Sequence, residues 1–168
     1  MRVLVTGSKG FVGHWLIAHL QDSGDQVMGL DTEVDITEPD GLREAVAGFA
    51  PDVICHLAAL SSVGASFGAS QATYEVNTVG SSNLLDAALA CRDRPRVLLV
   101  SSSEVYGRVS PADLPLVEDR PFAPVSPYAA SKAAAEVIGL QAFLGAGLEV
   151  IRARPFNHTG PGQRPDFV

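Results

Sequence analysis

Short runs of consecutive apolar residues alternate along the chain with segments whose apolar positions recur every three or four residues. The runs are typical of strands buried on both faces of a parallel sheet, and the periodic segments predict amphipathic helices. Strands are expected at residues 3–5, 26–30, 34–37 (a very short one), 53–57, 97–100 and 148–151. Helices are expected at residues 11–20, 39–49, 69–91 and 128–144. The sequence therefore predicts an α/β fold of the Rossmann type, a doubly wound parallel sheet with strand order 3-2-1-4-5-6.

Composition and charge narrow the class of protein. The 168 residues are 46% hydrophobic and 18% charged, which fits one globular domain with a buried core. The formal net charge of −7 and the lack of a basic stripe argue against a nucleic-acid partner. No apolar run approaches the roughly 20 residues of a membrane span, and no signal peptide precedes the first strand, so a cytoplasmic location is expected. Cys55 and Cys91 lie far apart, so neither a disulfide framework nor a metal site is predicted.

Gly7, Gly10 and Gly13 lie in the turn between the first strand and the first helix. In dinucleotide-binding folds the first such glycine permits a tight turn, the second lets the backbone approach a pyrophosphate, and the third lets the helix pack on the strand. The N-terminus of the helix then faces the phosphates. Asp31 closes the second strand, where a carboxylate binds the adenosine ribose and opposes a 2′-phosphate. The predicted cofactor is NAD, with NADP as the alternative because Lys9 lies in the glycine loop.

Tyr128 and Lys132 are four residues apart at the start of a predicted helix, so their side chains lie on one helix face. A nearby cation stabilises a phenolate, and a tyrosine needs such help to exchange protons near neutral pH. The strand over residues 97–100 runs into three serines, at the edge of the sheet where open α/β folds bind ligands. A serine hydroxyl there can bind the same substrate oxygen that the tyrosine protonates.

Four motifs carry a family resemblance, and in chain order they are Thr6–Gly13, His56–Ala59, Ser102–Gly107 and Tyr128–Lys132. This ordered set resembles the extended short-chain dehydrogenase/reductase family, which contains nucleotide-sugar epimerases, dehydratases and reductases. The resemblance extends over essentially all 168 residues. It implies that residues 1–153 form an NAD(P)-binding Rossmann domain and that residues 154–168 begin a substrate-binding region. Because relatives continue well past this point, the substrate domain is expected to be largely missing from this chain.

The resemblance also implies roles for particular residues. Tyr128 is the expected general acid or base, Ser102 stabilises the reacting oxygen, and Lys132 binds the nicotinamide ribose and biases the tyrosine. The residues expected to bind the cofactor are Gly7, Gly10, Phe11, Val12, Gly13, Asp31, Asp35, Ile36, Leu57, Ala58, Ala59, Asn77, Tyr128, Lys132 and Pro155. The residues expected to bind the substrate are Ser61, Ser102 and Asn157.

The segment from Arg154 to Gln163 is similar to the one that follows the sixth strand in the GDP-mannose branch of the family. It implies reduction of a GDP-linked 4-keto-6-deoxy sugar at C4 by hydride transfer, and the short third strand is closer to the pattern of the reductases. Glu104 supports an alternative, because dehydratases of the family carry a glutamate at this place that abstracts a proton from C5. A 4,6-dehydratase or 4-epimerase therefore stays open, as does a dinucleotide-binding module without turnover.

Many relatives form dimers through a four-helix bundle, which implies that the helices over residues 69–91 and 128–144 are the contact surface of a homodimer. Ala133, Ala134 and Ala135 are expected to be exposed there and to permit close approach, although alanine is equally a plain helix former. The predicted partners are therefore a nucleotide-sugar substrate and a second copy of the chain.

Overall fold

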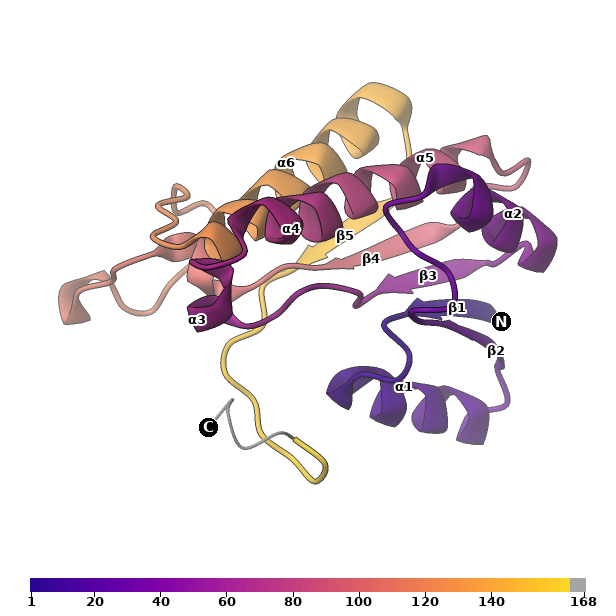
Figure 1. The fold of residues 1–168 in the computed structure, drawn as a ribbon, viewed down its shortest axis with the longest axis horizontal. Helices are drawn as coiled ribbons and strands as arrows, with labels where there is room; N and C mark the ends of the chain where they lie inside the picture. The colour runs from indigo at the N-terminus through magenta and orange to yellow at the C-terminus, as the bar shows by residue number, and fades with distance from the viewer. Residues whose placement is uncertain (164–168) are drawn as a thin grey trace.

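Five parallel strands form one sheet in the computed structural model, which describes residues 1–163 (Figure 1). Their bounds are β1 Arg2–Thr6, β2 Gln26–Leu30, β3 Val53–His56, β4 Arg96–Val100 and β5 Val150–Ala153. The order across the sheet is β2-β1-β3-β4-β5, and every neighbouring pair is parallel. The predicted Rossmann-type fold is therefore confirmed. Residues 164–168, the end of the region expected over 154–168, lie outside the described residues.

The predicted short strand over residues 34–37 is wrong, because this segment turns and does not pair with β2. The Asp35 carboxylate accepts hydrogen bonds from the N–H group of Thr37 at 2.9 Å and from its hydroxyl at 2.8 Å, which closes a local turn. Ile36 then packs so close to Gly80 that a Cβ atom there would lie 2.6 Å from the Cδ1 atom of Ile36. The sheet ends at β2, and the other strands keep the predicted order.

The last strand begins two residues later than predicted, at Val150 and not at Leu148. Gly147 ends the preceding helix in the left-handed conformation, with φ of 70°. The N–H group of Leu148 then donates to the carbonyl of Ala142 at 3.1 Å. Leu148 therefore belongs to the helix terminus, and the strand extends further toward the carboxyl edge of the sheet.

Helices lie on both faces of the sheet, as predicted (Figure 1). α1 (Phe11–Asp22) covers one face, and α2 (Pro39–Phe49), α5 (Gly80–Ala90) and α6 (Pro127–Ala146) cover the other. The shorter elements are α3 Val63–Ser66, α4 Ser70–Tyr74, the π-helix η1 Glu75–Val79, and the 3₁₀ helices η2 Ser103–Tyr106 and η3 Pro111–Asp113. The helix predicted over residues 69–91 is thus α4, η1 and α5 in succession. Within residues 1–163, no helix is both long and apolar enough to cross a membrane.

The core has one layer on each side of the sheet, because alternate strand residues point to opposite faces. Leu4 and Ile54 are fully buried on the side of α2 and α5, together with Leu84. Val5 and Cys55 are buried on the side of α1. The two layers fix the sheet between the helices and leave its carboxyl edge for a site.

The prediction of exposed alanines on α6 is wrong for Ala133 and Ala135, which are 7% and 3% exposed. Ala133 packs against Val105 and Tyr106 of η2, so α6 has neighbours beyond the sheet. Ala134 is half-buried and lies at the surface beside η1. Only this alanine of the three is available for a contact with another molecule.

Candidate active site

The glycine loop joins β1 to α1, and its glycines are required by close packing. Gly7 has a φ of 70°, and a Cβ atom there would lie 2.8 Å from the backbone nitrogen of Ala58. A Cβ atom at Gly13 would lie 2.2 Å from the carbonyl oxygen of Gly7, so only glycine lets α1 approach the loop. Gly10 is the N-cap residue of α1, and no side chain caps this helix. The first-turn N–H groups, including those of Phe11 and Val12, are therefore available for an anion such as a pyrophosphate.

Asp31 follows β2 and lies beside the glycine loop, as its predicted role requires. Its Oδ2 atom accepts a hydrogen bond from the N–H group of Lys9 at 2.8 Å, and its Oδ1 atom accepts one from Thr32 at 3.0 Å. The ammonium group of Lys9 pairs with Glu33 at 2.8 Å. Sequence reasoning missed this ion pair, because residues 9 and 33 meet only when β1 and β2 are paired.

Residues 57–59 continue from β3 toward the same edge of the sheet. The N–H group of Leu57 donates to the carbonyl of Thr6 at 3.2 Å, and that of Ala58 donates to the hydroxyl of Thr6, also at 3.2 Å. Leu57, Ala58 and Ala59 are half-buried, so part of each residue is accessible to a ligand at this edge. The two residues expected beside the adenine differ from each other, since Asp35 is exposed and Ile36 is buried in the core.

His56 is a buried, hydrogen-bonded residue of the core. Its Nδ1 atom lies 2.7 Å from the hydroxyl of Thr6, and its Nε2 atom lies 3.0 Å from the hydroxyl of Ser81. Burial lowers the pKa of His56 from 6.5 to about 3, with a smaller contribution from the charge of Lys132. The ring is therefore neutral at physiological pH, and it ties β1, β3 and α5 together.

Asn77, predicted to stand behind the cofactor, lies in the π-helix η1 and is almost fully buried. Its side-chain oxygen accepts a hydrogen bond from the N–H group of Leu60 at 2.8 Å. Its amide nitrogen donates to the carbonyl of Leu60 at 3.0 Å and to the hydroxyl of Ser131 at 2.9 Å. Asn77 thus fastens the loop after β3 to the helix that carries Tyr128 and Lys132. π-helical turns often occur at functional sites.

Lys132 and Tyr128 lie on α6 beside the carboxyl end of β4. The buried ammonium group of Lys132 donates to the carbonyl of Val100 at 2.8 Å, and burial lowers its pKa to about 8. Burial raises the pKa of Tyr128, interaction with the hydroxyl of Ser102 lowers it, and the Glu104 carboxylate raises it. Tyr128 is 8% exposed, as is Ser102. The structure therefore brings the predicted serine, tyrosine and lysine together at one edge of the sheet.

Glu104 lies in the second position of η2, and it is half-buried. Its N–H group donates to the hydroxyl of Ser102 at 3.2 Å, which makes Ser102 the N-cap of η2. Its carboxylate is close enough to Tyr128 to affect the pKa of the phenol. Glu104 therefore lies beside Ser102 and Tyr128.

The segment from 154 to 163 runs from β5 toward α1, on the lower side of the sheet in Figure 1. The carbonyl of Pro155 accepts a hydrogen bond from the N–H group of Ser103 at 2.9 Å. Further along, the indole of Trp15 donates to the carbonyl of Pro161 at 3.0 Å. Asn157 lies between these anchors and is exposed, as is Ser61 in the loop after β3. Both residues are accessible to a ligand, and their roles stay predictions.

Arg154 and Glu136 form a buried ion pair that sequence reasoning missed. The guanidinium group donates to both carboxylate oxygens of Glu136 at 2.8–2.9 Å, and Glu136 is fully buried. Arg154 also donates to the hydroxyl of Tyr106 at 3.0 Å and to the carbonyl of Glu118 at 2.9 Å. No spacing in the sequence signals this pair, because its two residues are 18 apart and lie on different elements.

A glycine turn after β1, an aspartate after β2, and a serine, tyrosine and lysine beside the end of β4 define a Rossmann-type dinucleotide-binding domain. Comparison with known proteins gives the family. The chain belongs to the NAD dependent epimerase/dehydratase family, which it matches over residues 3–168.

Named relatives catalyse several reactions on nucleotide sugars. The chain is 40% identical over 169 residues to GDP-6-deoxy-D-mannose reductase of Pseudomonas aeruginosa, which covers 99% of this chain and 55% of the reductase. It is 32% identical to dTDP-glucose 4,6-dehydratase of Neisseria gonorrhoeae, covering 98% of this chain and 56% of the dehydratase. The chain therefore spans about half the length of the curated relatives it matches.

Solved structures agree in fold and in cofactor class. The structure of RMD from Pseudomonas aeruginosa complexed with NADPH superposes with a TM-score of 0.89 at 40% identity, covering 99% of this chain and 56% of that chain. UDP-glucose 4-epimerase of Thermus thermophilus complexed with NAD gives a TM-score of 0.91 at 33% identity, covering 98% and 58%. The family resemblance and the NAD(P) dependence expected of the family are thus confirmed.

Proposed function

We propose that this chain carries the cofactor-binding region of an NAD(P)-dependent reductase that reduces a GDP-linked 4-keto-6-deoxy sugar at C4. The observation that carries the proposal is the cluster of Ser102, Tyr128 and Lys132 at the carboxyl end of β4. The identity of 40% to a GDP-6-deoxy-D-mannose reductase supports the substrate class. We assign cofactor binding to residues 1–153 and the start of the substrate region to residues from 154 onward.

The residues of the glycine loop fit a dinucleotide, because α1 lacks a side-chain cap and the loop leaves no room for a Cβ atom at Gly13. Gly10, Phe11 and Val12 would hold the pyrophosphate, and Asp31 would hold the adenosine ribose. A reduced nicotinamide bound at this edge would supply the hydride that adds to C4. The hydroxyl of Ser102 holds the C4 oxygen of the substrate, and Tyr128 donates its proton to that oxygen, so the carbonyl becomes a hydroxyl.

The electrostatics of Tyr128 favour the acid role. Because burial raises the pKa of its phenol, Tyr128 carries its proton near neutral pH and can release it to a developing alkoxide. The Lys132 ammonium group, with a pKa of about 8, remains mainly charged at pH 7. Burial, Ser102 and Glu104 shift the pKa of the Tyr128 phenol and Lys132 is not among these causes, so support of the phenolate by this cation is part of the proposal. The carbonyl of Val100 fixes the position of this charge.

Glu104 supports a second candidate function. A carboxylate beside Tyr128 could accept a proton from carbon, which is the step that a 4,6-dehydratase needs and a reductase does not. The 32% identity to a dTDP-glucose 4,6-dehydratase is in line with this alternative, and a 4-epimerase belongs to the same class. A dinucleotide-binding module without turnover is the third candidate, and the titration with GDP-mannose described below tests it.

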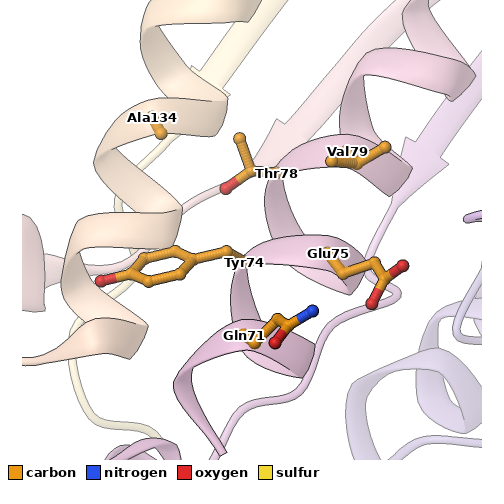
Figure 2. Close-up of a pocket in the computed structure, with 6 residues that line it drawn as sticks. All are labelled: Gln71, Tyr74, Glu75, Thr78, Val79 and Ala134. Carbon is orange, nitrogen blue, oxygen red and sulfur yellow. The ribbon is translucent and has the colours of Figure 1, made fainter.

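We also propose that the surface over α4, η1 and α6 is the contact of a homodimer. An open pocket of about 440 Å³ lies there. Figure 2 shows the residues that line it: Gln71, Tyr74, Glu75, Thr78, Val79 and Ala134. Tyr74 and Val79 are 42% and 47% exposed, and Val137 on α6 is 53% exposed. Apolar side chains gathered on one surface favour association.

Light scattering over a concentration series tests the proposed dimer, which predicts a mass that rises from monomer to dimer. A wild-type chain that stays monomeric throughout, or a Val79→Glu variant that dimerises equally well, contradicts the proposal. The cytoplasmic location also stays a prediction.

Titration with NADH and NADPH tests the proposed function, followed by the fluorescence of Trp15, the single tryptophan. The titration is repeated in the presence of GDP-mannose. Saturable NADH binding that GDP-mannose strengthens supports a surviving sugar-nucleotide site, and binding that GDP-mannose leaves unchanged supports the module without turnover. Absence of binding by both dinucleotides contradicts the proposal.

Turnover distinguishes the candidate reactions. With a GDP-linked 4-keto-6-deoxy sugar and NADH, the wild-type chain is expected to oxidise NADH, and Tyr128→Phe is expected to bind NADH without oxidising it. With NAD⁺ in place of NADH, release of water from GDP-mannose that requires Glu104 and leaves the amount of NAD⁺ unchanged would instead favour the dehydratase.

A further inference from the structure

Two charged residues beside Asp31 bear on which dinucleotide the site accepts. The ammonium group of Lys9, in the glycine loop, pairs with the Oε2 atom of Glu33 at 2.8 Å. The other carboxylate oxygen of Glu33 accepts a hydrogen bond from the N–H group of Asp31 at 3.2 Å. The N–H group of Lys9 in turn donates to the carboxylate of Asp31. Lys9, Asp31 and Glu33 therefore form one closed set of contacts between the loop and the end of β2.

We infer that Glu33, by holding Lys9, sets the preference of this chain for NADH over NADPH in addition to Asp31. This inference rests on the proposed binding of a dinucleotide with its adenosine ribose at Asp31. NADH presents a 2′-hydroxyl at that ribose, whereas NADPH presents a 2′-phosphate with about two negative charges. The two cofactors therefore differ at the place where the three charged residues meet.

The charges of the set oppose the phosphate. Asp31 and Glu33 contribute two negative charges, and Lys9 contributes one positive charge, so the set is negative overall. A 2′-phosphate would need a cation, and Lys9 is the basic residue of this set, but its ammonium group is already neutralised by Glu33. The pairing favours the charged form of both groups, because Glu33 raises the pKa of Lys9 and Lys9 lowers the pKa of Glu33.

The 2′-hydroxyl of NADH needs no such rearrangement, because the Asp31 carboxylate can accept its hydrogen bond while the ion pair persists. The solved neighbours leave this preference undecided, since one was complexed with NADPH and another with NAD. The inference therefore rests on the residues at positions 9, 31 and 33 of this chain and not on the neighbours.

Removal of one charge separates the contributions. In Glu33→Gln the ammonium group of Lys9 is released to a 2′-phosphate, and one repelling charge is lost. The affinity for NADPH is expected to rise by about tenfold, while that for NADH changes by about twofold or less. In Lys9→Gln/Glu33→Gln most of this gain is expected to disappear. Glu44→Gln, an exposed glutamate on α2, is the control that removes the same charge elsewhere.

The assay is the Trp15 fluorescence titration of the full chain with NADH and with NADPH, at low and high ionic strength, with circular dichroism to verify folding. The expected tenfold gain shrinks at high salt, because the residues involved are exposed. A gain no larger than that of Glu44→Gln, an equal gain in the double variant, or a wild-type preference for NADPH overturns the inference while dinucleotide binding stands. Failure of the wild-type chain to bind either dinucleotide overturns the proposed function, and the inference with it.

Discussion

Substitution of Arg154 and substitution of Glu136, the two partners of the buried ion pair, should lower the free energy of unfolding by unequal amounts. The carboxylate of Glu136 is fully buried, and the side chain of Arg154 is 11% exposed. Removing one partner of such a pair leaves an uncompensated charge in the interior, at a cost of about 3–5 kcal/mol. Arg154→Met does this to Glu136, and it also removes the hydrogen bonds to Tyr106 and Glu118. We expect the free energy of unfolding to fall by about 4 kcal/mol.

Substitution of Glu136 instead of Arg154 should cost less, because the charge that remains keeps other partners. In Glu136→Leu the guanidinium group of Arg154 keeps its hydrogen bonds to Tyr106 and Glu118, and it remains over the ring of Phe122, with 4.9 Å between its central carbon and the ring centroid. The expected loss is about 2 kcal/mol. The double variant Arg154→Met/Glu136→Leu contains neither charge, so its loss should be about 2–3 kcal/mol, well below the sum of the two single losses.

Urea unfolding at neutral pH, followed by Trp15 fluorescence and by circular dichroism, measures these differences. The control is Arg96→Met, which breaks the exposed pair with Glu149, whose side chains are 54% and 66% exposed, and which should cost far less. Losses that add up in the double variant, or an Arg154→Met loss no larger than that of the control, would refute the argument that an isolated buried carboxylate dominates the energetics.

Three further predictions follow from the packing of the site. Because burial lowers the pKa of His56 from 6.5 to about 3, the unfolded chain binds one more proton than the folded chain between these pH values. The free energy of unfolding should therefore fall by about 1.4 kcal/mol for each pH unit from pH 6.5 toward pH 3. Urea unfolding of the His56→Gln variant should lack this contribution to the slope. Gly13→Ala should lower the unfolding free energy by at least about 2 kcal/mol because its Cβ atom meets the carbonyl of Gly7, whereas Gly41→Ala, in open space on α2, should raise it by about 0.5–1 kcal/mol, both measured by urea unfolding. Asn77→Ala removes the hydrogen bonds to Leu60 and should lower the melting temperature and weaken NADH binding together, measured by calorimetry and fluorescence titration.

The sheet and the glycine loop could be predicted because each leaves its signal within a short stretch of sequence. Buried parallel strands require continuous apolar runs, and the packing around Gly7 and Gly13 excludes any larger residue. The turn over 34–37 could not be predicted from hydropathy, because the hydrogen bonds of Asp35 decide it and its apolar residues are those of a strand. The π-helix η1 also escaped prediction, since it changes the hydrogen-bond register of a segment whose apolar pattern is helical throughout.

The contacts that complete the site join residues far apart in the sequence. Arg154 and Glu136 are separated by 18 residues, and Lys9 and Glu33 by 24. Lys9 and Glu33 meet only after β1 and β2 are paired, and Arg154 and Glu136 meet only after α6 has packed against β5, so no spacing rule predicts either pair. The exposure of Ala133 and Ala135 was mispredicted for a related reason, because the contacts of η2 and of the sheet with α6 depend on the tertiary fold.

The two ion pairs indicate how chemistry and specificity are divided in this molecule. Arg154 binds Glu136 on α6 and Tyr106 on η2, so it joins these two elements. α6 carries Lys132, and η2 begins directly after Ser102. The residues that would transfer a proton are thus held by buried contacts, where a small displacement is costly. The pair of Lys9 and Glu33 is exposed, and its loss should alter which dinucleotide binds without altering the fold. A reaction class shared by reductases, dehydratases and epimerases is what the buried contacts would preserve, whereas the choice of cofactor depends on side chains that can change independently of them.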